Sequence, residues 1–235
     1  GVRTCALPIS VSPGSAEFLS SIGAWQAIDA SRVARVQTMR IFGDAPSSEM
    51  TFNAYDAGLP ELAFIAESGR MQAALWARIE AAPHVRVLCP AQCETLTHGD
   101  SHADITLADG TVVTARLIVG ADGAQSWVRE QAGIAAAVHD YHQCGVVANF
   151  TCEHSHQDTA YQWFRDDGVL AFLPLPVDHT TARVSMVWST GEAQARAEAQ
   201  AAQDAEQPVG LLRRQHGARR SEEHTSELQS HLNLV

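Results

Sequence analysis

The sequence predicts an α/β fold in which a split nucleotide-binding domain is interleaved with an antiparallel β-sheet domain. The chain has 235 residues, of which 46% are hydrophobic and 18% charged, so it is long enough to bury a sizeable core. Two sets of alternating strand patterns, at about residues 36–66 and 144–189, lie on either side of a mixed helix and strand section at about 69–140. An apolar run within that section ends in a Gly/Asp turn at residues 120–123. A chain that leaves one domain, enters a second and returns predicts two interleaved domains.

The composition excludes several classes of protein. The apolar fraction is too high for a disordered chain, and no apolar run is long enough to span a bilayer. A net charge of -11 argues against a general nucleic-acid binder, which needs a basic surface. The five cysteines are irregularly spaced, and no secretory leader is recognisable. We therefore expect a reducing, cytoplasmic compartment.

Both ends of the chain read as translated sequencing-library adapter. The stretch 220–231 matches one adapter strand, and residues 1–10 resemble the opposite strand with Arg3 in place of a glutamine. We expect 1–10 and 220–235 to be non-native, and the residues between them to be an internal piece of a longer gene. The alternative is that each end is an ordinary polar terminus.

The N-terminal part alternates between helix and strand patterns. A helix is predicted from a cap at Ser15 to about Ala30, with a buried face formed by apolar residues at helical spacing. These apolar residues are Phe18, Ile22 and Trp25. A second helix is predicted over 71–82. Strands of an antiparallel sheet are predicted at 36–42, 50–55 and 62–66.

The remaining elements are mostly strands. Asp109-Gly110 predicts a two-residue hairpin turn between strands at 104–108 and 111–118. A short strand at 85–88 precedes this hairpin, and a helix at about 125–132 follows it. Further strands are predicted at 144–152, 160–164, 169–175 and 182–189, before a polar, Ala-rich helix at 191–206.

The turn at residues 120–123 is the strongest chemical signal. An apolar strand would deliver Asp122 to its carboxyl edge, where α/β sheets bind ligands. Gly120 and Gly123 permit close approach to the main chain. Arg129 lies one turn into the following helix, three residues after Ser126, as a fixed cation. The alternative is a plain strand–turn–helix connection with Asp122 at the helix entry.

The stretch 120–129 resembles the second fingerprint of flavin-dependent aromatic hydroxylases, which share the para-hydroxybenzoate-hydroxylase-like fold. Three further stretches, at about 15–25, 135–143 and 160–189, resemble the ubiquinone-biosynthesis hydroxylases among them. The resemblance implies an FAD-binding domain of the glutathione-reductase type at 11–35 and 67–140, truncated at both ends. It implies a substrate-domain sheet at 36–66 and 141–190, with 191–219 as a helix of the truncated C-terminal part.

The resemblance also assigns roles to individual residues. It implies that five residues bind FAD: Arg70, Gln72, Asp122, Gly123 and Arg129. It implies that an apolar roof over the flavin ring excludes water, formed by Trp163, Phe172 and Pro174. The alternative for Arg70 and Gln72 is that each is simply an exposed polar residue at the start of a helix. The alternative for the three apolar residues is that they only pack in the core. No residue stands out as a catalytic acid or base.

The implied activity is that of an FAD-dependent monooxygenase. It would hydroxylate a polyprenylated phenol or quinone precursor in ubiquinone biosynthesis with oxygen, through a flavin C4a-hydroperoxide, with NAD(P)H as a candidate reductant. No Gly-x-Gly-x-x-Gly phosphate loop occurs in the chain, so we expect the fragment itself to be inactive. The alternatives are a non-catalytic FAD-binding or assembly subunit, or a flavin-dependent reductase or halogenase. Peripheral association with the inner membrane or with a biosynthetic complex is a further option.

A metal site is not expected. Six histidines and cysteines lie close together in the sequence: His139, His142, Cys144, Cys152, His154 and His156. Their spacing matches no closed zinc pattern, and a strand from 144 to 152 would hold its two ends about 25 Å apart.

Overall fold

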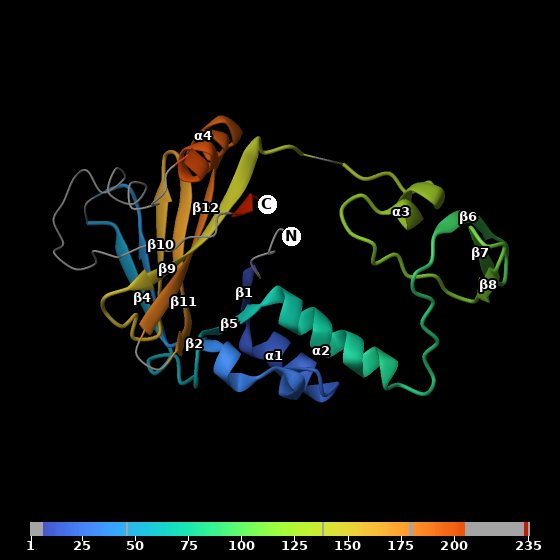
Figure 1. Ribbon diagram of the computed structural model, residues 1–235, viewed down its shortest axis with the longest axis horizontal. Coiled ribbons are helices and arrows are strands. Elements are labelled where there is room, and N and C mark those ends of the chain that lie inside the picture. The colour runs from blue at the N-terminus through green and yellow to red at the C-terminus, as the bar shows by residue number, and fades with distance from the viewer. Residues whose placement is uncertain (1–6, 46, 138, 179–180, 205–232, 235) are drawn as a thin grey trace. The chain divides into compact units, whose positions relative to one another are not determined.

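The computed structural model describes residues 7–45, 47–137, 139–178, 181–204 and 233–234 (Figure 1). The chain divides into two compact units, one formed by residues 1–82 with 141–235 and the other by residues 83–140. The structure confirms the mixed α/β class, because helices and three separate β-sheets occur together. No helix in the described part combines the length and the apolar character that crossing a membrane requires.

The first unit contains a small three-stranded sheet. Its order is β1 (Pro8–Val11), β5 (Ala63–Glu67) and β2 (Ala34–Val36), and both pairings are antiparallel. Two helices adjoin it, α1 (Pro13–Ser21) and α2 (Ser68–Glu80). Apolar side chains from β1, α1 and α2 form one core cluster that includes Val11, Leu19 and Leu75.

Helix α1 corrects the prediction for this part of the chain. Its N-cap is Ser12, whose hydroxyl accepts a hydrogen bond from the Ser15 amide at 3.1 Å, so Ser15 itself lies inside the helix. The buried residues are Ala16 and Leu19, whereas the side chain of Phe18 is 65% exposed. The reason is length: the helix ends at Ser21, so no continuous helical face reaches Trp25, which lies in the short 3₁₀ helix η1 (Trp25–Ala27).

The same unit contains a seven-stranded sheet in the order β13-β9-β12-β11-β10-β3-β4. All neighbouring strands are antiparallel except β10 and β3, which are parallel. The strands are β3 (Thr38–Phe42), β4 (Glu49–Asn53), β9 (Gln143–Cys152), β10 (Thr159–Arg165), β11 (Gly168–Asp178), β12 (Thr181–Gly191) and β13 (Asn233–Leu234). The predicted strands at 36–42, 50–55 and 62–66 are therefore shared between two sheets, because β2 and β5 pair with each other in the small sheet.

The two faces of the large sheet pack against different elements, because successive side chains of a strand point to opposite faces. One face forms a core with α4 (Glu192–Asp204), in which Leu170 and Trp188 pack with Ala195 of the helix. The other face packs against the small sheet, where Leu173 and Leu175 meet a cluster of apolar side chains. That cluster consists of Ala34, Val36, Ala63, Ile65 and Ala160.

The second unit is a three-stranded antiparallel sheet of β6 (Cys93–His98), β7 (Ala103–Leu107) and β8 (Val112–Ala115), with the short helix α3 (Trp127–Gln131). The predicted hairpin forms, but its loop is longer than the two residues expected, because Thr106 pairs with Val112 and the Gly110 amide donates a 2.9 Å hydrogen bond to the Leu107 carbonyl. Gly110 has a φ of 81°, and the Asp109 carboxylate accepts a 2.9 Å hydrogen bond from the Thr111 amide.

One predicted strand of this unit is wrong, and another is shorter than predicted. Residues 85–88 are not a strand, and β8 ends at Ala115, which leaves the side chains of Leu117 and Val119 77% and 74% exposed. The physical reason is that a strand needs a neighbour to satisfy its backbone groups, and no described strand pairs with either segment.

Candidate functional site

The turn between β8 and α3 is organised by Asp122. Its Oδ1 accepts a hydrogen bond from the Ser126 hydroxyl at 2.5 Å, and its Oδ2 accepts one from the Val128 amide at 3.1 Å. These bonds, with the Ser126 hydroxyl contributing most, lower the pKa of Asp122 below its ordinary value. Asp122 is therefore a charged group that holds the start of α3.

Ser126 and Arg129 complete the same network. The Ser126 hydroxyl, which is buried, accepts a 3.0 Å hydrogen bond from the Arg129 amide and caps α3. The Arg129 side chain folds back, and its Nη2 donates to the Ala124 carbonyl at 2.8 Å. Asp122, Ser126 and Arg129 thus each have an identified structural partner, and the turn keeps its shape through its own side chains.

The main chain at Gly123 is uncovered. Its φ is 89°, and no heavy atom beyond its two chain neighbours lies within 4 Å of the position that a Cβ would occupy. Glycine is favoured in this left-handed conformation. At Gly120, by contrast, a Cβ would lie 3.0 Å from Val128. The turn therefore offers open backbone to a ligand at Gly123 and close packing at Gly120.

A cavity of about 310 Å³ lies beside this turn within the second unit. The turn and α3 contribute Gly120, Ser126, Val128 and Arg129 to its wall, and β6 contributes Leu96 and His98. The remaining lining residues are Ala103, Ile118, Ala132 and Ile134. Most of the wall is aliphatic, and Arg129 is its one permanently charged residue.

The other two predicted cofactor residues lie in the first unit. Arg70 is exposed in the first turn of α2, and its Nε donates to Glu67 Oε2 at 2.8 Å. Gln72 is exposed two residues further along the helix. These two residues belong to one unit and Asp122, Gly123 and Arg129 to the other, so we describe them as two separate groups. The cofactor role of all five stays a prediction.

The three residues predicted to roof the flavin ring lie together on one face of the large sheet. The Trp163 ring is stacked on Phe42 at 5.3 Å and meets the edge of Phe172 at 5.6 Å, and Pro174 is fully buried. Trp163 and Phe172 pack against the core cluster that contains Ala195 of α4. The opposite face, towards the small sheet, presents Leu173 and Leu175. Substrate contact by Trp163, Phe172 and Pro174 stays a prediction.

A second cavity, which the sequence did not predict, lies where the two sheets of the first unit meet. It has a volume of about 280 Å³ and is lined by Pro8, Arg32, Ile65, Ala66, Glu67, Asn149, Leu175, Pro176 and Arg183. Its sequence signal is weak: Arg183 is the one charged residue of β12.

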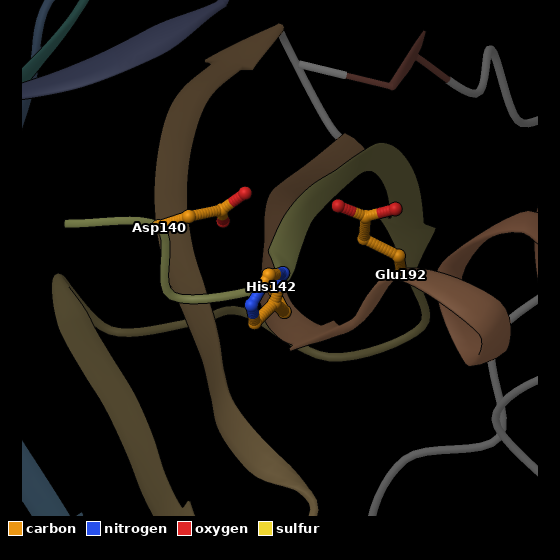
Figure 2. A group of neighbouring side chains, drawn as sticks. All are labelled: Asp140, His142 and Glu192. Carbon is orange, nitrogen blue, oxygen red and sulfur yellow. The ribbon is translucent and has the colours of Figure 1, made fainter. Parts of the chain in front are cut away.

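One group of possible metal ligands occurs among the described residues. Figure 2 shows Asp140 and His142, which precede β9, with Glu192 at the start of α4, and their possible ligand atoms all lie within 4.8 Å of one another. Of the six histidines and cysteines considered above, only His142 belongs to this group. All three residues are exposed, and exposed acidic groups commonly gather without an ion. The group therefore supports no metal assignment.

Comparisons with known proteins cover most of the chain. The family model described as "FAD binding domain" matches residues 10–233. The 3-demethoxyubiquinol 3-hydroxylase of Escherichia coli is 33% identical over 187 residues, covering 80% of this chain and 46% of the relative. The human mitochondrial ubiquinone biosynthesis monooxygenase COQ6 is 35% identical over 191 residues, covering 77% of this chain and 40% of the relative. The chain spans less than half the length of these curated relatives.

Solved structures support the fold. PqsL of Pseudomonas aeruginosa superposes with a TM-score of 0.72 at 19% identity, covering 92% of this chain and 57% of PqsL. The 2,6-dihydroxypyridine-3-hydroxylase of Arthrobacter nicotinovorans gives a TM-score of 0.58 at 16% identity, covering 81% of this chain and 47% of that enzyme.

Proposed function

The chain belongs to the FAD binding domain family of FAD-dependent monooxygenases, and from this premise we propose that it acts in the hydroxylation of an aromatic ring during ubiquinone biosynthesis. One observation carries the proposal: a family match across nearly the whole chain, with relatives at about one third identity that are named 3-demethoxyubiquinol 3-hydroxylase and ubiquinone biosynthesis monooxygenase. The substrate would be a polyprenylated phenol or quinone precursor, with oxygen as the second substrate and NAD(P)H as the source of electrons.

The geometry of the turn at residues 120–129 fits a flavin nucleotide. Open main chain at Gly123 lets a flat or phosphorylated group approach closely, and Arg129, hydrogen-bonded to the carbonyl of the next residue Ala124, supplies a positive charge. We also propose Arg70 and Gln72 as contacts of FAD. When bound, FAD supplies the electron transfer to oxygen on which ring hydroxylation depends.

Asp122 takes an indirect part in this arrangement. Both of its carboxylate oxygens already accept hydrogen bonds, from Ser126 and Val128. Its role is therefore that of a positioning residue, which fixes the backbone of the turn so that the Gly123 main chain stays available.

A pair of glycine variants tests cofactor binding. Gly123 and Gly133 both have a positive φ and open space around the Cβ position, so an alanine strains the backbone similarly at each. We expect Gly123→Ala, made in a protein that spans the full length of the relatives, to weaken the binding of FAD, measured by quenching of flavin fluorescence, and Gly133→Ala to leave it unchanged. Equal effects of the two variants would contradict the proposed cofactor site.

Product analysis tests the activity. The assay uses a protein that spans the full length of the relatives, supplied with FAD, NAD(P)H and a prenylated phenol. This protein should consume oxygen and place one oxygen atom from ¹⁸O₂ on the ring. Flavin binding without oxygen uptake would indicate a non-catalytic subunit, and oxidation of NAD(P)H without a hydroxylated product would indicate a reductase. A product that forms only with added halide would indicate a halogenase. Association with the inner membrane or with a biosynthetic complex stays a prediction.

A further inference from the structure

The large sheet ends at β4, and the outer edge of this strand pairs with no described strand. In an antiparallel pair, alternate residues direct their main-chain N–H and C=O groups to opposite edges of the strand. The Ser48 carbonyl and the Ala54 amide, which flank β4, both form hydrogen bonds with residues that flank β3. Even-numbered residues of β4 therefore face β3, and the main-chain groups of Glu49, Thr51 and Asn53 face the free edge.

This edge lacks the features by which natural sheets avoid pairing with other strands, such as prolines, bulges and unpaired charges. The strand β4 contains no proline, and its register with β3 is continuous. Its one charged residue, Glu49, is paired with Arg40 of β3, whose Nη2 lies 2.6 Å from Glu49 Oε1. The edge can therefore accept a further strand.

Apolar side chains lie along the same edge. Met50 and Phe52 are two residues apart in β4, so they lie on one face of the sheet, and they are 56% and 46% exposed. Their partners in β3 are Ile41 and Met39, which share this face and are half-buried. Together the four side chains form an apolar strip that reaches the open edge, as expected of a surface that another chain covers.

The main chain of β4 is complementary to that of a second, antiparallel β4 related to it by a two-fold axis at Thr51. In this register the two Thr51 residues exchange reciprocal hydrogen bonds, and the Asn53 amide of each copy reaches the Glu49 carbonyl of the other. An axis at any other position leaves part of β4 unpaired. An axis at Glu49 would also place two carboxylates opposite each other, which is unfavourable. Pairing about Thr51 is therefore the register that the strand favours.

The side chains agree with the same register. Met50 of each copy faces Phe52 of the other, and a thioether against an aromatic ring is a favourable contact. Glu49 faces Asn53, whose Nδ2 donates to Thr38 Oγ1 at 3.2 Å and keeps its second N–H for the carboxylate. Charge and shape thus match between two copies of this strand, so a second copy is the occupant that the edge fits.

We propose that the protein forms a symmetric dimer in which two β4 strands pair edge to edge about Thr51 and join two large sheets into one. The strand has five residues, so the interface lies at the small end of specific protein contacts. We therefore expect a weak dimer, with a dissociation constant of about 10 μM. The inference goes beyond the proposed function and does not depend on it, because neither cofactor nor substrate takes part.

Sedimentation equilibrium tests the dimer in a protein that spans the full length of the relatives. Between about 1 and 100 μM, the mass should rise from that of a monomer towards that of a dimer. Met50→Lys should weaken the dimer about tenfold or more, because it places a lysine against Phe52 of the other copy on both sides of the axis. Val112→Lys is the matched control and should leave the dimer unchanged, because Val112 is 57% exposed on β8, an edge strand of the second unit.

Disulfide trapping tests the register. The exposed cysteines of the described residues are first removed by Cys89→Ser and Cys93→Ser. Thr51→Cys should then give a covalent dimer on mild oxidation, because residues paired across the axis have Cα atoms about 5.5 Å apart, within the range of a disulfide. Glu49→Cys is the control: in this register the two copies of residue 49 lie about 13 Å apart, so no disulfide should form.

A monomer at 100 μM, a dimer that survives Met50→Lys, or equal trapping at positions 51 and 49 would overturn the inference. A monomer whose Thr51 amide is protected from hydrogen exchange would also overturn it, because another strand of the same chain would then cover the edge. If Met50→Lys fails to fold, as judged by circular dichroism, the comparison of Thr51→Cys with Glu49→Cys decides. None of these measurements uses FAD or turnover, so their failure leaves the proposed function untouched.

Discussion

The Ser126 hydroxyl donates a 2.5 Å hydrogen bond to the Asp122 carboxylate and at the same time accepts one from the Arg129 amide. The pair therefore connects the turn to the first residues of α3. Because the side chains of Asp122 and Ser126 are hydrogen-bonded to each other, the part of the turn that a ligand can reach is the main chain at Gly123. Asp122 therefore fixes the shape of the turn, and Gly123 leaves the main chain of the turn exposed.

The first prediction concerns pH. The pKa of Asp122 is lowered from 3.8, chiefly by Ser126, so its stabilising contribution is complete above this ordinary value and is lost as the pH falls through the lowered pKa. In NMR spectra, the Val128 amide should shift with an inflection below pH 3.8, and Asp122→Asn should remove that inflection. Asp109, whose pKa its hydrogen bonds with Thr111 also lower, is the control: the Thr111 amide should titrate in both proteins. An unchanged Val128 titration in the variant would be inconsistent with this network.

The second prediction concerns Gly168, the first residue of β11. Its φ is 134°, and a Cβ there would lie 1.9 Å from the Ser189 carbonyl oxygen of the neighbouring strand. Gly168→Ala must displace backbone, so it should lower the free energy of unfolding by about 3 kcal/mol. Gly191→Ala, at the end of β12, meets no atom within 4 Å and should change it by about 0.5 kcal/mol or less. Urea unfolding measures both, and similar losses in the two variants would contradict the argument.

Elements were predictable from the sequence where a local pattern coincides with available partners. The alternating strands of the large sheet and the Asp109-Gly110 turn lie where they were predicted, because strand alternation and turn chemistry are local properties. The strand expected at 117–118 does not form, because an apolar sequence alone cannot satisfy its backbone groups. The buried face of α1 was wrong for a related reason: helical spacing was counted past the residue where the helix ends.

The candidate sites also differ in how far they can be predicted from the sequence. Asp122, Ser126 and Arg129 are close in sequence, so their shared turn was visible as a motif. The cavity with Arg32 and Arg183 was not, because it depends on the packing of one sheet against another. Its trace in the sequence is Arg183, the one charged residue of β12, which identifies an unusual position but not its partners.

A third prediction concerns cysteine reactivity. Burial raises the pKa of the Cys152 thiol, so less of it is thiolate at a given pH, and it is also shielded from reagents. Cys89 and Cys93 are exposed. With iodoacetamide at mildly alkaline pH, Cys152 should be alkylated about tenfold more slowly than Cys93, as followed by peptide mass spectrometry. In strong urea the two rates should become equal, and a difference that persists there would show that burial is not its cause.

The last prediction separates packing from substrate contact at Trp163. Its ring contacts Phe42, Tyr161 and Phe172, with ring centroids 5.3 to 5.9 Å apart. Trp163→Ala should therefore lower the free energy of unfolding by about 3 kcal/mol. Combined with Phe42→Ala, it should show a coupling of about 1 kcal/mol.

Phe164 provides the control, because it is the next residue of β10, points to the opposite face and is 49% exposed. Phe164→Ala should destabilise the chain by about 1 kcal/mol or less. A milder change, Trp163→Phe, keeps an aromatic ring in the core, so it tests substrate contact separately from packing. If Trp163 only packs, this variant should bind a prenylated phenol as tightly as the unmodified protein does. A clear loss of affinity at unchanged stability would instead place the indole against the substrate, because core packing alone gives no reason for binding and stability to change separately.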